Sequence, residues 1–101
     1  EALGTIHSID LFSNQQVNYD FAVEELTITN LVKSFPDNIA QEWSISFIAG
    51  DTDPIITTPL EANGMSIKWL YAEPVFEANK RYLITFKQII DTIYGIWTVL
   101  E

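Results

Sequence analysis

The chain has 101 residues, no cysteine and a formal net charge of −9, from fourteen acidic and five basic residues. This length predicts a single domain, residues 1–101, that buries about two-thirds of its unfolded surface and folds without a covalent cross-link. The acidic balance argues against nucleic acid and anionic membrane surfaces as partners, and the lack of cysteine excludes disulfides and thiolate metal sites.

No apolar run approaches the ~20 residues that a transmembrane helix requires, so membrane insertion is not expected. The chain begins with Glu1, and no basic stretch followed by an apolar core opens it. We therefore expect a fragment or module of a larger protein.

An alternation of apolar and polar residues dominates the chain, with the period of a strand that covers a core on one side. The predicted strands, in chain order, are residues 5–12, 17–23, 26–32, 42–49, 66–71, 81–86 and 92–100. The clearest are VNYDFAV at 17–23 and EWSISFIA at 42–49, whereas TIHSIDLF at 5–12 is the least regular.

Turn-forming residues separate these segments at intervals of about ten residues. They are SNQQ at 13–16, SFPDN at 34–38, AGDTDP at 49–54, EANG at 61–64, AEP at 72–74 and EANK at 77–80. These regularly spaced turns predict an all-β fold, an antiparallel, jelly-roll-like sandwich of seven or eight short strands. The best helical candidate, FKQIIDTIY at 86–94, is rich in branched residues and is interpreted as part of a hairpin.

The last predicted strand, TIYGIWTVL, is apolar on both faces. Such a strand is either covered on both sides or offers its second face to another subunit. Gly95 in its middle indicates a bulge or a close backbone approach. The residues predicted for a subunit interface are Tyr94, Ile96 and Leu100, with Phe12 and Ile9 as a weaker set near the N-terminus.

Residues for catalysis or metal binding are sparse. His7 is the single histidine, so a catalytic triad or a multi-histidine metal site is excluded within this chain. Asp51 and Asp53 form a D-x-D, but Asp and Pro are also typical of a tight turn, and the ligand series of a calcium loop is missing. Neither a phosphate-binding glycine loop nor a nucleophile elbow is present. We predict no enzyme, no metal and no cofactor.

The three tryptophans, Trp43, Trp69 and Trp97, all lie inside alternating segments, where core packing is the ordinary role for at least two of them. The functional alternative is a surface that stacks on sugars or contacts a subunit. For a glycan site, the residues considered are Trp69 and Tyr71, together with the loop carboxylates Asp51 and Asp53.

Three stretches in order resemble a small β module of bacteriophage virion proteins, such as tail fibres, baseplate appendages and head fibres. They are LTITNLVKSFPDNIAQEWSISFIAGDTDPIITTP, IKWLYAEPVFEANKRYLITF and GIWTVL. Relatives of this kind often carry a glycine between the Trp and the Pro, which WLYAEP lacks. The resemblance implies a structural or attachment role on the surface of a phage particle, commonly as a trimer or tethered to a capsid or tail protein. It supplies no catalytic residues.

The combined prediction is a non-enzymatic virion module that assembles with itself, as a trimer, and with a neighbouring virion protein. The alternative is a carbohydrate-binding domain that recognises a glycan on the host surface. An assembly role requires uncovered apolar residues on the last strand, whereas a glycan role requires exposed aromatics beside loop carboxylates.

Overall fold

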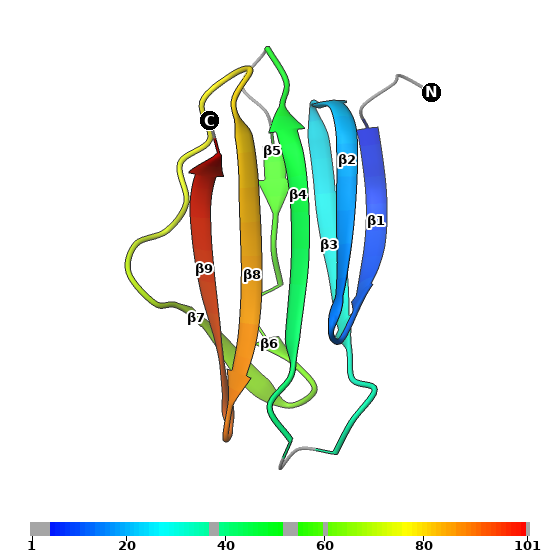
Figure 1. Ribbon diagram of the computed structural model, residues 1–101, viewed down its shortest axis with the longest axis vertical. Coiled ribbons are helices and arrows are strands. Elements are labelled where there is room, and N and C mark those ends of the chain that lie inside the picture. The colour runs from blue at the N-terminus through cyan, green and yellow to red at the C-terminus, as the bar shows by residue number, and fades with distance from the viewer. Residues whose placement is uncertain (1–4, 37–38, 52–54, 60, 101) are drawn as a thin grey trace.

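A computed structural model describes residues 5–36, 39–51, 55–59 and 61–100. The fold is all-β, and no helix occurs in the described part of the chain. The nine strands of this part are β1 (Thr5–Phe12), β2 (Gln15–Val23), β3 (Glu25–Val32), β4 (Glu42–Ala49), β5 (Ile55–Thr57), β6 (Glu61–Ala62), β7 (Met65–Trp69), β8 (Arg81–Ile89) and β9 (Thr92–Leu100) (Figure 1).

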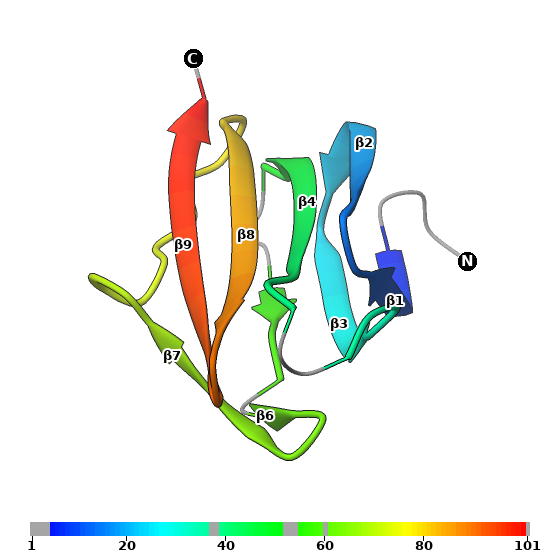
Figure 2. The ribbon, with the colours of Figure 1, turned by 60° about the horizontal axis from the view of Figure 1, so that its bottom comes forward.

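The strands form two sheets, and consecutive strands from β1 to β5 alternate between them. The small sheet has the order β1-β3-β5 and is parallel throughout. The large sheet has the order β2-β4-β8-β9-β7-β6 and is mixed, with antiparallel β4-β8-β9 at its centre (Figure 2). The predicted purely antiparallel pairing is therefore wrong for the small sheet and for the pairs β2–β4 and β7–β9 of the large sheet. The described residues form nine strands, against the predicted seven or eight.

The turn at residues 13–14 explains why pairing is parallel. It connects β1 to β2, but the two strands belong to different sheets, so each pairs with the strand two further along the chain. An alternating sequence determines which face of a strand is buried, but it does not determine the neighbour with which the strand pairs. Alternation alone therefore does not predict that these pairs are parallel.

Side chains from both sheets form one buried cluster. Its largest members from the large sheet are Trp43, Phe47, Tyr82 and Phe86, and the small sheet contributes Leu26 and Ile28 among others. The fully buried Trp43 also donates its indole N–H to the carbonyl of Val32, at 2.9 Å, and so ties β4 to the end of β3. The alternate apolar residues of EWSISFIA all belong to this cluster, as predicted, although Ser44 and Ser46 on the opposite face of β4 are buried as well.

The β8–β9 hairpin confirms the interpretation of residues 86–94. Strands β8 and β9 are in unbroken antiparallel register from Arg81 and Leu100 to Ile89 and Thr92.

The buried side chain of Gln41 holds the connection between β3 and β4. Its amide donates to the carbonyls of Phe35 and Pro36, at 3.0 and 3.2 Å. This amide satisfies main-chain groups of the β3–β4 connection that would otherwise lose hydrogen bonds to water.

Candidate interaction surface on the large sheet

The outer face of the large sheet is the surface that points away from the buried cluster. On β9, Ile93 is fully buried and Gly95 lies under the ring of Trp69, so the alternate residues Tyr94, Ile96 and Leu100 belong to the outer face. All three predicted interface residues on β9 therefore share one surface. No described segment forms a further layer over it, and each of these side chains stays partly exposed or exposed.

Neighbouring strands extend the apolar part of this outer face. On β8, Leu83 lies between Ser46 of β4 and Thr98 of β9, and Ile48 of β4 lies beside Arg81 in the next row. Both apolar side chains are partly buried by their neighbours. Together with Ile96, they add apolar surface to the outer face.

Basic residues are concentrated on the same face. Tyr94 lies between Lys68 of β7 and Lys87 of β8, and Leu100 lies beside Arg81. Lys87 in turn faces Glu42 of β4. Three of the five basic residues of a chain with a net charge of −9 are thus on the outer face, so the negative charge of the molecule is reduced there.

The β2 side of the outer face is polar and hydrogen-bonded within itself. Asn18 accepts hydrogen bonds from the hydroxyl of Ser46, at 2.6 Å, and from the amide of Gln16, at 2.7 Å. The hydroxyls of Ser44 and Thr85 are 3.3 Å apart. The apolar residues of the outer face therefore lie mainly on its β8 and β9 half.

The weaker interface set lies elsewhere. Phe12 and Ile9 belong to β1, at the edge of the small sheet, so the fold does not bring them to Tyr94. Phe12 is 47% exposed, whereas Ile9 packs against the buried cluster. His7 also lies in β1, and its side chain is outside the described part of the structure.

The four residues considered for a glycan site are separated by the fold. Trp69 packs inward, with its ring centroid 5.8 Å from that of Phe86, which is the ordinary core role. Tyr71, two residues later, is 86% exposed. Asp51 is exposed two residues after the end of β4, and Asp53 lies outside the described residues. Of this set, only Tyr71 presents an exposed aromatic ring.

The predicted close approach at Gly95 is confirmed, and no bulge accompanies it. Gly95 pairs with Trp69 on one side and with Phe86 on the other, in regular register. A Cβ at this position would lie 2.6 Å from the Trp69 ring. The glycine is therefore needed because the indole occupies the space above it.

The connection between β7 and β8 is a functional candidate that sequence reasoning missed. Its start is fixed by the Leu70 N–H, which donates to the Gly95 carbonyl at 2.9 Å, and by the Trp97 indole, which donates to the Ala72 carbonyl at 2.9 Å. A pocket of about 180 Å³ beside this contact is lined by Tyr71, Ala72, Gly95, Ile96 and Trp97. The sequence does not indicate the pocket, because the predicted strand 66–71 runs through Tyr71, whereas β7 ends at Trp69.

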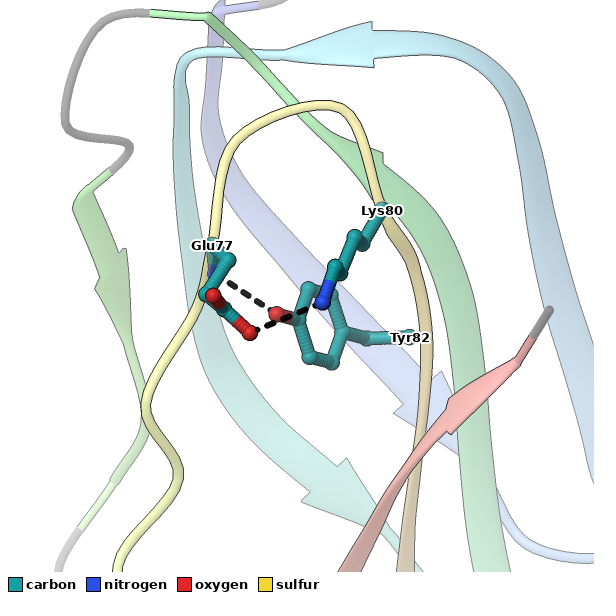
Figure 3. Close-up of polar contacts among 3 residues, drawn as sticks. All are labelled: Glu77, Lys80 and Tyr82. Atoms are coloured by element: carbon teal, nitrogen blue, oxygen red, sulfur yellow. Dashed lines mark hydrogen bonds and ion pairs between the residues drawn. The ribbon is translucent and has the colours of Figure 1, made fainter.

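The far end of this connection is held by Tyr82. The backbone N–H of Glu77 donates to the phenol oxygen of Tyr82, at 2.6 Å, and the Glu77 carboxylate is 3.0 Å from the ammonium of Lys80 (Figure 3). The ring of Phe76 packs edge-on against Tyr82, with centroids 5.0 Å apart. A connection fixed at both ends presents Tyr71 in a defined position.

Comparison with protein-family models, with curated proteins and with solved structures gave no match. Within the described residues, no three or more His, Cys, Asp or Glu side chains are grouped as metal ligands would be. The same part of the chain contains no helix able to cross a membrane. The most distinctive surface is the outer face of β8 and β9.

Proposed function

We propose that this protein is a non-enzymatic bacteriophage virion module that assembles with copies of itself and with a neighbouring virion protein through the outer face of the large sheet. The observation that carries this proposal is the second apolar face of β9, where Tyr94, Ile96 and Leu100 have no covering layer among the described residues. The phage setting and the trimer come from the resemblance of three sequence stretches to virion modules.

The size of the outer face supports this role. The four long strands β2, β4, β8 and β9 have eight or nine residues each. At ~3.3 Å per residue and ~4.8 Å between strands, they give a face of roughly 600 Å² before side-chain relief is counted. A standard protein interface buries about 800 Å² per partner, so this face is close to the required size.

The charge distribution supports the same surface. Two copies with a net charge of −9 repel each other over most orientations. On the outer face, Lys68, Lys87 and Arg81 reduce this repulsion, and the residues between them are apolar or small. The electrostatic penalty for the approach of two copies is therefore lower at this face than the net charge alone implies.

Substitution of Tyr94 tests the proposal. We expect Tyr94→Asp to shift the assembly to monomers in light scattering, because the apolar ring is lost and a charge is placed in the contact. The two flanking lysines make the carboxylate tolerable in a monomer. The matched control is Ile90→Asp, which adds the same charge at a residue that is 83% exposed in the β8–β9 turn and should leave the mass unchanged.

An unchanged mass for Tyr94→Asp would remove the outer face from the assembly. The second candidate function, recognition of a host glycan, is favoured by one observation, the 86% exposed ring of Tyr71 beside the pocket of about 180 Å³. Binding to host cell-wall polysaccharide by a monomer, lost with Tyr71→Ala, would support that alternative instead. In both cases the protein works by binding and not by turnover.

The arrangement of the two sheets bears on the finer class of the fold. Both sheets contribute to one buried cluster, which is the arrangement of a β-sandwich. We propose that the fold is a jelly-roll-like sandwich. The parallel pairs β1-β3-β5 and β2-β4 depart from the pairing of a jelly roll.

A further inference from the structure

Strand β9 has a partner on both sides along only part of its length. On one side β8 pairs with all of β9, from Thr92 to Leu100. On the other side β7 pairs with β9 only from Thr92 to Gly95. Figure 1 shows the chain beyond β7 bowing away from β9 before it returns to β8. Residues 96–100, which we call the open half of β9, therefore form a sheet edge within the described structure.

The direction of the main-chain groups shows what this edge offers. The Gly95 carbonyl accepts a hydrogen bond from Leu70 on the β7 side. Main-chain groups of successive strand residues point to alternate sides, so the N–H and C=O of Trp97 and Val99 also point to this side. No backbone hydrogen bond joins these four groups to another described residue. The open half thus presents two donors and two acceptors in line.

This edge lacks three of the features that protect natural sheet edges from pairing, namely charge, proline and a bulge. Such protection consists of charged residues, proline, bulges or a covering segment. Residues 92–100 contain no charged residue and no proline, and the register with β8 is unbroken. By contrast β2, at the other edge of the sheet, has a register shift between Asn18 and Ala22 and carries Asp20 within it. Of these two strands, only β9 has an edge without a charged residue, a proline or a register shift.

We propose that two copies of this chain join by antiparallel pairing of their open halves, about a two-fold axis at Thr98. In this register Trp97 of each copy forms a hydrogen-bonded pair with Val99 of the other, which uses all the main-chain groups that point outward. The two large sheets then become one continuous sheet. This inference rests on the proposed self-assembly and adds the edge as a second contact, so a trimer formed through the outer face would become a hexamer.

The side chains are self-complementary in this register. On the outer face, Ile96 lies beside Leu100 of the second copy and Thr98 lies beside its own counterpart, and such apolar and Thr–Thr pairs stabilise antiparallel strands. No charges face each other along the strand, which matters for a chain with a net charge of −9. The pocket next to Ile96 lies where Leu100 of the second copy arrives, and its volume of about 180 Å³ has room for that side chain.

Cross-linking tests the register directly. Residues that face each other in a pair without hydrogen bonds have Cα atoms ~4.5 Å apart, within the ~4.4–6.8 Å range of a disulfide. The chain has no cysteine, so Thr98→Cys introduces the only thiol. We expect this variant to form a disulfide-linked dimer several-fold faster under mild oxidation than Ser66→Cys, a matched control that is also exposed on the outer face, on β7.

Two substitutions at Val99 test the main-chain contact. Val99→Pro removes an N–H that points to the open side, so it leaves the hydrogen bonds between β8 and β9 in place while it prevents pairing. Val99→Lys places on the edge the residue that natural proteins use against pairing, and it serves if the proline variant does not fold. In the Thr98→Cys background, either change should abolish the rapid cross-link, with a far-UV circular dichroism spectrum like that of the parent.

The outcomes separate this inference from the proposed function. A Thr98→Cys variant that cross-links no faster than Ser66→Cys would overturn the edge pairing. A folded Val99→Pro variant that keeps its rapid cross-link would also overturn it. If the assembly then still dissociates with Tyr94→Asp, the proposed function stands through the outer face alone. If the wild-type chain stays monomeric at high concentration and no cross-link forms, both are wrong.

Discussion

At the scale of single residues, Gly95 is the position where sequence and packing are most tightly connected. The Trp69 ring lies where a Cβ of residue 95 would be, and that ring also packs against Phe86. We expect Gly95→Ala to lower the free energy of unfolding by ~1–3 kcal/mol, because overpacking moves the indole or the strand. Thermal or denaturant unfolding of the purified variant measures this loss.

A matched substitution separates overpacking from the general effect of replacing a glycine. Gly64 has a positive φ of 76°, and no atom lies within 4 Å of the place that a Cβ would take there. Gly64→Asn should therefore be nearly neutral, since Asn tolerates this backbone conformation. The cost of Gly95→Ala should also shrink in a Trp69→Leu background, as a double-mutant cycle would show. Equal costs in both backgrounds would mean that the ring is not the cause.

At the scale of elements, the turn between β8 and β9 is strained by one residue. Four described residues other than glycine have positive φ, and three of them, Asn14, Asn63 and Asn79, are asparagines in turns that the sequence predicted. The fourth is Ile90, with φ of 58°, although a branched side chain disfavours this conformation. We expect Ile90→Asn to raise the free energy of unfolding by about 1 kcal/mol, measured by chemical denaturation.

The control for the turn is its neighbour. Ile89 is also an exposed isoleucine, but it ends β8 and has no positive φ, so Ile89→Asn should not stabilise the protein. Stabilisation by both changes would point to a general benefit from removing exposed apolar surface. Stabilisation by neither would show that the rest of the hairpin compensates for the strain at Ile90.

The strands themselves were largely predictable, and their pairing was not. Alternation located β4 and β9 with their observed bounds, because each must bury every second side chain. The short strands β5 and β6, with three and two residues, were missed because such lengths hold no readable period. The open half of β9 was also beyond the sequence, since it exists only because β7 ends at Trp69 and the chain then turns away.

At the scale of the whole molecule, the net charge of −9 decides how assembly depends on salt. Two like-charged copies repel, and the range of this repulsion falls from about 10 Å at 0.1 M ionic strength to about 3 Å at 1 M. Neither proposed contact relies on ion pairs between copies, because the open half of β9 is uncharged and the outer face is apolar at its centre. We therefore expect the assembled fraction, measured by sedimentation velocity, to rise with sodium chloride concentration.

The salt experiment needs a charge control and a suitable salt. Asp91→Asn with Glu73→Gln removes two exposed carboxylates and changes the net charge from −9 to −7, one unit for each substitution, so the salt dependence should become weaker. Chloride is used because sulfate would itself strengthen apolar contacts. Dissociation at high salt would contradict the expectation. It would mean that Lys68, Lys87 and Arg81 bind acidic groups of the partner, and that charge pairing instead of apolar burial holds the copies together.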